Sequence, residues 1–281
     1  MNSSLPSEPL ATSAKWEVEP LCLGKVTHVV FDFDGTLSWL RHGWPELMLE
    51  VFEENMPPSL STRDSETRGE LTTLILALNG KPTIEQMRAF AEWSLSQGGA
   101  QLDPEQLRVT FQDRLDAQIR ERTAQVYSKT VAPDAYVVAG ARALLEFLAE
   151  RGVQLFVLSS TVEHRVREEA ELLGIAHFFG ERIHGSPLDP SQFTKRAVFE
   201  RILAEAGISG EQLLAFGDGP VEIAEAVRLG GAAVAVCSDE NHNGSGVCDP
   251  WKFNQLRAAG AHAALPDFRN ALELIAPLLL S

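Results

Sequence analysis

The sequence predicts an α/β fold, in which a doubly wound parallel sheet forms the core and an all-α segment is inserted into it. The first observation is that short apolar runs, rich in β-branched and aromatic residues, alternate with helical stretches that end at glycines. The second is that this alternation stops over residues 40–133, where only helical stretches occur. Strands that alternate with helices form parallel sheets with helices on both faces.

The core begins with an apolar run over residues 26–33, which is too short for a helix and predicts a buried parallel strand. Further strands are expected over residues 153–160, 212–218 and 232–238. The helices expected with them cover residues 141–150, 162–173, 194–206, 221–229 and 268–280. Residues 25–39 and 134–281 together form the predicted α/β core.

The inserted segment, residues 40–133, is predicted to be entirely helical. Thr83 and Asp103 are expected to start helices, and Pro104 is favourable at a first helical position. The helical stretches cover residues 44–56, 70–78, 83–98 and 103–129. Later in the chain, the glycine-containing stretch 241–249 is predicted to be a surface loop.

Length, composition and charge limit the classes of partner. The 281 residues suit a core with one inserted domain, and 44% hydrophobic with 22% charged residues is ordinary for a globular chain. The formal net charge of −15 repels phosphate backbones, so a nucleic acid is not an expected partner. No apolar run reaches the roughly 18 residues of a membrane span, so no membrane partner is expected.

The N-terminal residues and the cysteines favour a cytoplasmic protein. Residues 1–24, rich in Ser, Pro and Glu, predict a flexible tail and lack the pattern of a secretory signal. The three cysteines, Cys22, Cys237 and Cys248, form no CxxC pair, which indicates reduced thiols. The oligomeric state is left open by the sequence.

Polar residues follow three of the predicted strands. Asp32, Ser159 and Asp218 lie at strand ends, and ligands of such sheets bind where the carboxyl ends of the strands meet. Asp34 lies two residues after Asp32, and Gly35 then permits a tight turn. A buried pair of like charges is costly without a cation, so these acids predict a cation and anion site.

Four sequence motifs in order resemble those of the haloacid dehalogenase-like hydrolase superfamily. The stretch DFDGTL, residues 32–37, resembles its first motif, and the apolar strand that ends at Ser159 resembles its second. Lys195 lies where the third motif has its lysine. FGDGPVEI resembles the fourth, with Asp218 and, four residues on, Glu222 where aspartate is more frequent.

The resemblance implies an Mg²⁺-dependent phosphatase with a Rossmann-like core and residues 40–133 as an α-helical cap. It implies that Asp32 is the nucleophile and Asp34 the general acid and base. The implied metal ligands are Asp32, Asp218, the Asp34 backbone carbonyl, and Glu222 either directly or through water. The residues implied to bind the phosphoryl group are Thr36, Ser159 and Lys195.

The leading hypothesis is hydrolysis of a small phosphomonoester, such as a sugar phosphate or a phosphoglycolate-like metabolite, because a closing cap excludes large substrates. A phosphomutase and a non-catalytic phospho-ligand binding protein remain as alternatives. Phosphonate hydrolysis would need a cap lysine, for which Lys81 and Lys129 are available. Dehalogenation is disfavoured by the intact acids. Arg41 and His42, just after the first motif, are expected either to contact substrate or to form a solvated hinge.

Overall fold

The computed structural model describes residues 26–79, 81–187 and 193–279. The chain divides into two compact units, of which Arg41–Gln125 is the second. The first, here called the core unit, is formed by the described residues before and after that range. The C-terminal boundary of the second unit falls within the long helix α4 (Pro104–Tyr127), before residue 133 at which the sequence prediction placed it.

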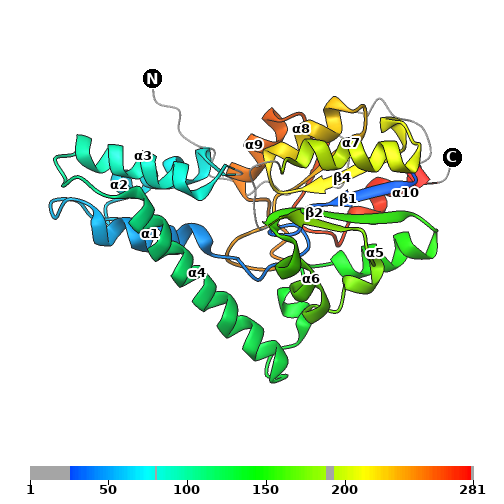
Figure 1. Ribbon diagram of the computed structural model, residues 1–281, viewed down its shortest axis with the longest axis horizontal. Helices are drawn as coiled ribbons and strands as arrows, with labels where there is room; N and C mark the ends of the chain where they lie inside the picture. The colour runs from blue at the N-terminus through cyan, green and yellow to red at the C-terminus, as the bar shows by residue number, and fades with distance from the viewer. Residues whose placement is uncertain (1–25, 80, 188–192, 280–281) are drawn as a thin grey trace. The chain divides into compact units, whose positions relative to one another are not determined.

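The core unit confirms the predicted α/β fold. Its described residues form a parallel sheet of six strands in the order β3-β2-β1-β4-β5-β6. The neighbouring strands β2, β1 and β4 are labelled in Figure 1. From β1 the chain passes to β2 and β3 on one side and then returns to β4, β5 and β6 on the other, so the strand order reverses between β1 and β4. The strands are β1 (His28–Phe31), β2 (Gln154–Val162), β3 (Ile183–Ser186), β4 (Leu213–Gly217), β5 (Ala232–Val236) and β6 (Ala263–Leu265).

Helices cover both faces of this sheet (Figure 1). Val29 and Phe31 pack against α5, α6 and α10 on one face, whereas Val30 packs against α7, α8 and α9 on the other. Because both faces are buried, β1 is apolar at successive positions and does not alternate. The helices are α5 (Ala141–Glu150), α6 (Glu163–Leu172), α7 (Lys195–Ala206), α8 (Pro220–Arg228), α9 (Pro250–Ala258) and α10 (Ala271–Leu279).

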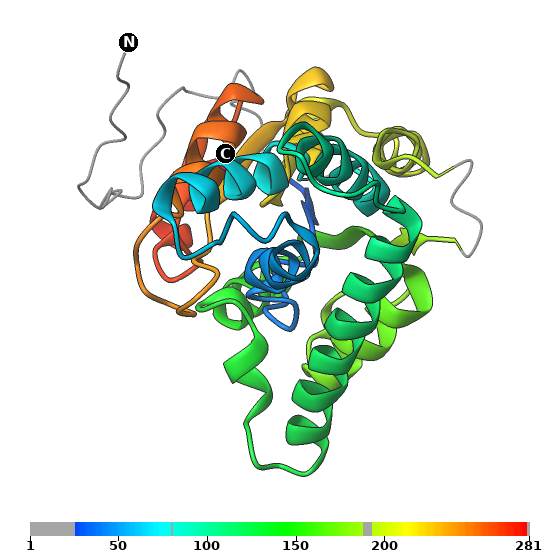
Figure 2. The ribbon, with the colours of Figure 1, turned by 90° about the vertical axis from the view of Figure 1, so that its left-hand side faces the viewer.

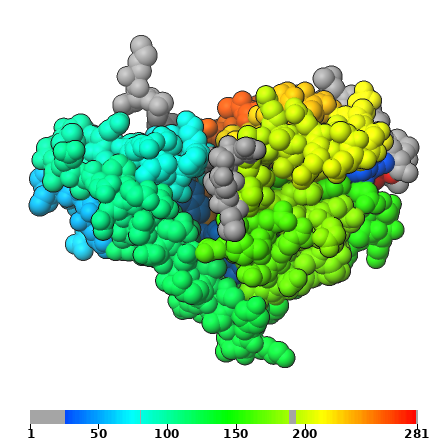
Figure 3. Space-filling model, viewed as in Figure 1, coloured from blue at the N-terminus to red at the C-terminus, as the bar shows by residue number. Residues whose placement is uncertain are grey.

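The second unit is helical and has its own apolar core. The Phe52 and Phe90 rings stack at its centre with centroids 3.9 Å apart, and Asp64 caps α2 by accepting a hydrogen bond from the Thr67 N–H. Figure 2 shows α4 as one long helix. In the space-filling view of Figure 3, the side chains of the helices of the second unit form a closely packed surface. The other helices are α1 (Trp44–Asn55), α2 (Ser65–Ala77) and α3 (Thr83–Ser96).

Among the strands and α-helices of the described core unit, β3, α9 and β6 were not predicted. The predicted surface loop 241–249 is wrong at its end, because Cys248 is buried and Asp249 caps α9. The Asp249 carboxylate accepts the Trp251 and Lys252 N–H groups and so starts a helix whose inner face buries Lys252, Phe253 and Leu256. In the described part of the chain, no helix is long and apolar enough to cross a membrane.

Candidate active site

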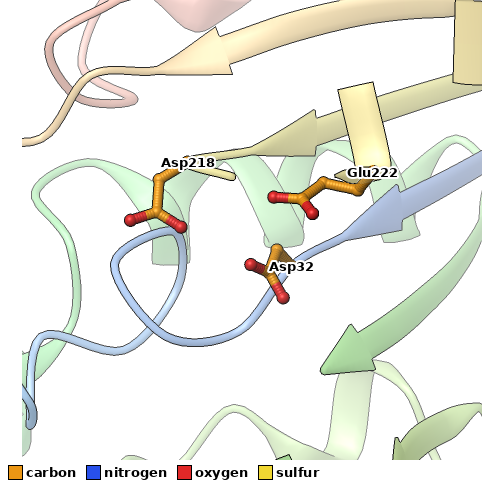
Figure 4. A group of neighbouring side chains, drawn as sticks. All are labelled: Asp32, Asp218 and Glu222. Atoms are coloured by element: carbon orange, nitrogen blue, oxygen red, sulfur yellow. The ribbon is translucent and has the colours of Figure 1, made fainter. Parts of the chain in front are cut away.

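Three carboxylates meet at the carboxyl end of the central strands. Asp32 follows β1, Asp218 follows β4, and Glu222 lies in the first turn of α8. One carboxylate oxygen from each lies within 4.8 Å of the other two, and Figure 4 shows the three side chains grouped around a common space. The sheet therefore brings together the acids that the sequence placed on separate strand ends.

Lys195 connects two of these acids. Its Nζ lies 3.0 Å from Asp32 Oδ1 and 2.8 Å from Glu222 Oε2. Lys195 is the first residue of α7, whose N-cap Thr194 accepts the Ala197 N–H through its side chain at 3.1 Å. The cap fixes where the helix starts and hence where the ammonium group lies.

Burial changes the proton affinity of the acids. Burial raises the pKa of Asp32 well above its ordinary value, although the adjacent Lys195 lowers it in part. Burial also raises the pKa of Asp218 to about 6, against the lowering effect of a second lysine, Lys252. Burial alone would lower the pKa of Lys195, but the Asp32 and Glu222 carboxylates raise it overall. A further cation near the acids would favour their charged forms.

Two glycines allow Glu222 to fold back toward the strand ends. A Cβ on Gly217 would lie 2.3 Å from Glu222 Cγ, so no other residue fits there without a shift. The Gly219 N–H donates to Glu222 Oε1 at 2.6 Å. Both carboxylate oxygens of Glu222 thus have a donor, one from the backbone and one from Lys195.

The turn after β1 carries Asp34, whose carboxylate is held by a residue that sequence reasoning did not select for this role. Thr161 Oγ1, near the end of β2, donates to Asp34 Oδ2 at 2.8 Å. Ser159, which was predicted to bind phosphate, is buried, and its Oγ accepts the Thr161 N–H at 3.0 Å. The sequence signal for Thr161 is its place two residues after Ser159, on the same side of an extended strand.

Thr36 is the predicted phosphate ligand with an unsatisfied hydroxyl. Its side chain is fully buried, and Oγ1 has no hydrogen-bond partner among the described residues. Buried polar atoms without a partner are rare and costly in folded proteins. Contact of Thr36 with a phosphoryl group stays a prediction.

Other residues singled out from the sequence lie in different places. Arg41 and His42 open the second unit, where the His42 carbonyl accepts hydrogen bonds from Gln118 and Arg122 at 3.0 Å each. Lys81 belongs to the same unit, whereas Lys129 belongs to the core unit. Contact of Arg41 or His42 with substrate stays a prediction.

A second buried lysine was missed by the sequence analysis. Lys252, in the first turn of α9, lies 3.1 Å from Asp218 Oδ2 and 2.7 Å from Glu240 Oε1. Its Nζ also donates to Ser238 Oγ at 3.0 Å. The sequence signal that could have found it is the pair Asp249–Pro250, a favourable helix start.

The donor set fits a divalent metal ion of the magnesium type. Carboxylate oxygens are the ligands that Mg²⁺ prefers. Two ammonium groups, of Lys195 and Lys252, contact four carboxylates in this region, those of Asp32, Asp218, Glu222 and Glu240. A divalent ion among these acids would favour their charged forms.

Comparison with known protein families matches residues 26–230 to the haloacid dehalogenase-like hydrolases. The phosphoglycolate phosphatase of Rhodospirillum rubrum is 28% identical over 215 residues, which cover 75% of this chain and 78% of that protein. The phosphoglycolate phosphatase of Mannheimia succiniciproducens is 25% identical over 213 residues, which cover 76% of this chain and 86% of that protein.

Among solved structures, a haloacid dehalogenase-like protein of unknown function from Agrobacterium tumefaciens resembles this chain with a TM-score of 0.64. The two are 15% identical, and the match covers 89% of this chain and 98% of that one. At this identity the likeness shows a shared fold.

Proposed function

The chain belongs to the haloacid dehalogenase-like hydrolase family, as an enzyme of its phosphatase type, and we propose that it uses Mg²⁺ to hydrolyse a small phosphomonoester through an aspartyl-phosphate on Asp32. The observation that carries the proposal is the place of Asp32. Its carboxylate is buried, contacts the Lys195 ammonium at 3.0 Å and shares a cluster with Asp218 and Glu222.

In the first step, a carboxylate oxygen of Asp32 attacks the phosphorus atom, and the bond from phosphorus to the leaving oxygen breaks. Asp34 gives its proton to that oxygen, and the alcohol departs. The hydrogen bond from Thr161 at 2.8 Å orients the Asp34 carboxyl group for this transfer. Lys195, Thr36 and Ser159 are the groups proposed to contact the phosphoryl oxygens.

In the second step, water attacks the phosphorus atom of the aspartyl-phosphate. The Asp34 carboxylate takes a proton from this water, and the bond between phosphorus and the Asp32 oxygen breaks. Inorganic phosphate leaves and both acids return to their starting forms. Asp34 thus reverses its role between the steps, while Asp32 carries the phosphoryl group from one to the other.

Asp32, Asp218, Glu222 and the Asp34 carbonyl are the groups proposed to hold Mg²⁺. When bound, the ion neutralises the negative charge that the carboxylate nucleophile and the phosphoryl group bring together. Glu222 receives donors from Lys195 and Gly219 on its two oxygens. We therefore propose that Glu222 reaches the ion through water, with Asp32 and Asp218 as direct ligands.

We propose a small carboxylated phosphomonoester of the 2-phosphoglycolate kind as the first substrate to test, since the relatives named above are phosphoglycolate phosphatases. The second unit is proposed to act as a cap that limits substrate size. The net charge of −15 requires that attraction of an anionic substrate come from local cations, and Lys195 is the candidate at the phosphorus atom.

The test is phosphate release from p-nitrophenyl phosphate, 2-phosphoglycolate and a panel of sugar phosphates, with Mg²⁺ or with EDTA. We expect release that requires Mg²⁺ and falls by about 1,000-fold or more in Asp32→Asn, which keeps the shape of the side chain. Acid quench during turnover followed by mass spectrometry should find phosphate on the peptide that contains Asp32.

Three outcomes would contradict the proposal in different ways. Release that is equal in the native protein and in Asp32→Asn removes the nucleophile. Turnover that appears only when a sugar bisphosphate is added assigns a phosphomutase. Binding of phosphate esters without turnover, retained in Asp32→Asn, assigns a non-catalytic binding protein.

A further inference from the structure

Lys252 is a buried cation that lies outside the four motifs of the sequence. Its side chain is 4% exposed and lies in the first turn of α9. A cation in the first turn faces the positive end of the helix dipole, and its burial adds a desolvation cost. Lys252 is therefore unfavourable for α9 by itself, and its contacts with other elements must compensate.

Those contacts are with two carboxylates from different parts of the chain. Nζ of Lys252 lies 3.1 Å from Asp218 Oδ2, at the end of β4. It lies 2.7 Å from Glu240 Oε1, in the connection between β5 and α9. Lys252 thus holds the carboxylate of Asp218, which the proposed function assigns to the metal ion.

A second chain of contacts leads from Lys252 to the turn after β1. Nζ donates to Ser238 Oγ at 3.0 Å, and Ser238 Oγ donates to the Gly35 carbonyl at 2.6 Å. Asp218 packs against the same glycine, since a Cβ on Gly35 would lie 2.0 Å from Asp218 Oδ2. The four residues form a closed ring that fixes Asp218 against the turn that carries Asp34.

Two effects of Lys252 on a bound cation oppose one another. Its positive charge repels a divalent ion and competes for an oxygen of Asp218, which weakens binding. Its contacts keep Asp218 and the turn after β1 in one arrangement. This strengthens binding because the ligands are already ordered before the ion binds. The sign of the change in Mg²⁺ affinity after removal of Lys252 therefore distinguishes the two roles.

We propose that Lys252 is a positioning residue, which through Asp218 and Ser238 holds the metal ligand and the Gly35 turn in the arrangement that binds Mg²⁺. This role rests on the proposed function, in which Asp218 binds the ion. Lys252 touches neither the nucleophile nor the substrate in this assignment. It acts on the metal through another side chain.

The test is isothermal calorimetry of Mg²⁺ binding to the full chain without substrate, for the native protein, Lys252→Met and Lys252→Arg. We expect the dissociation constant to rise by about tenfold or more in Lys252→Met, the range found when groups that orient metal ligands are lost. Lys252→Arg keeps the charge and the donors, and should recover most of the affinity. An unchanged or lower dissociation constant in Lys252→Met would overturn the proposal.

Ser238→Ala separates position from charge. It opens the ring at Gly35 without changing any charge. We expect the dissociation constant to rise by about tenfold, the lower end of the range for lost orienting groups. A purely electrostatic role of Lys252 predicts no change, and that result would overturn the ring. This variant also decides the question if Lys252→Met fails to fold.

Arg142→Met is the matched control for loss of a cation in the core unit. Arg142 pairs with Asp134 at 2.6 Å and donates to the Leu173 and Gly174 carbonyls, away from the acids. It should lower thermal stability and leave Mg²⁺ binding at the native value.

Native protein that binds Mg²⁺ but hydrolyses no phosphomonoester would contradict the proposed function alone. Native protein that binds no Mg²⁺ would overturn both.

Discussion

Lys195 and Lys252 occupy similar settings in two different helices. Each lies in the first turn of its helix, behind a side-chain N-cap supplied by Thr194 in α7 and by Asp249 in α9. Each is buried and contacts two carboxylates. Since the helix dipole disfavours a cation at this end, the neighbouring carboxylates determine both positions.

The two lysines differ in what their carboxylate partners do. Lys195 contacts Asp32, which is proposed both as the nucleophile and as a metal ligand. Lys252 contacts Asp218, which is proposed as a metal ligand alone, and a hydrogen bond joins Lys252 to Ser238. We therefore propose that the same side chain in the same helical position acts on the phosphoryl group in one case and on the metal ion in the other. The comparison predicts separable effects of the two lysines on turnover and on metal binding.

The largest effect is expected for Lys195→Met. Loss of the cation beside Asp32 should lower kcat by about 100-fold to 1,000-fold, as found when a group that stabilises transition-state charge is removed. The Mg²⁺ dissociation constant, measured by calorimetry, should change less than in Lys252→Met. The comparison would be contradicted if Lys195→Met lowered kcat less than Lys252→Met does and raised the Mg²⁺ dissociation constant more.

A smaller effect on turnover is expected for Thr161→Val. This change keeps the shape and removes the donor to Asp34, which holds the carboxylate at 2.8 Å. We expect kcat/KM to fall by about tenfold, close to 1.4 kcal/mol of lost orientation. The control is Thr161→Ser, which retains the hydroxyl and should keep most of the activity. Equal rates for Val and Ser would show that the hydrogen bond does not orient the acid.

The comparison also explains how far the sequence could lead. Lys195 and Glu222 were found because four motifs in order resemble a known family. Asp32 and Asp218 were found without the family, because each lies at the end of a predicted strand. Lys252 was missed because its helix was missed, although Asp249–Pro250 is the same helix-start signal that was used at Asp103–Pro104.

Other parts of the site have no local signal. Glu240 and Ser238 reach Lys252 only after the connection between β5 and α9 has folded, so their partners depend on tertiary structure. The strands β3 and β6 span four and three residues and do not lie within a longer apolar run, so they were missed. β1 is also four residues long, but it lies in the apolar run 26–33, which the sequence shows.

The two N-caps offer a finer comparison. Thr194→Ala and Asp249→Ala should each lower the free energy of unfolding by about 1 kcal/mol, because each cap satisfies backbone N–H groups of a first turn. Asp249→Ala should also weaken Mg²⁺ binding, because Asp249 fixes the backbone of Lys252 at 2.8 Å. Thr194→Ala should lower kcat instead. Urea unfolding measures the free energy of unfolding, and calorimetry measures Mg²⁺ binding. If Thr194→Ala changed Mg²⁺ binding alone, the regions around Lys195 and Lys252 would not have separate roles.

The smallest expected effect concerns how stability depends on pH, which we assign to a histidine and not to the two lysines. Neighbouring carboxylates raise the pKa of Lys195 and of Lys252, so both stay protonated near neutral pH. His262 behaves differently, because burial lowers its pKa and its Nδ1 accepts the Ala233 N–H at 3.1 Å. The unfolded chain therefore binds a proton more readily than the folded one, and this contribution to stability is lost as the pH falls below the ordinary histidine value of about 6.5.

His262→Gln tests this assignment, since a glutamine oxygen can accept the same N–H but does not titrate. We expect the difference in unfolding free energy between native protein and variant to be larger at pH 7.5 than at pH 5.5 in urea titrations. This difference decreases toward low pH because the native protein must then either protonate the buried His262 ring or keep it neutral. The variant has no titrating group at this position. The same difference at both pH values would assign the pH dependence to other groups. The carboxylates around Lys195 and Lys252 would then be tested next.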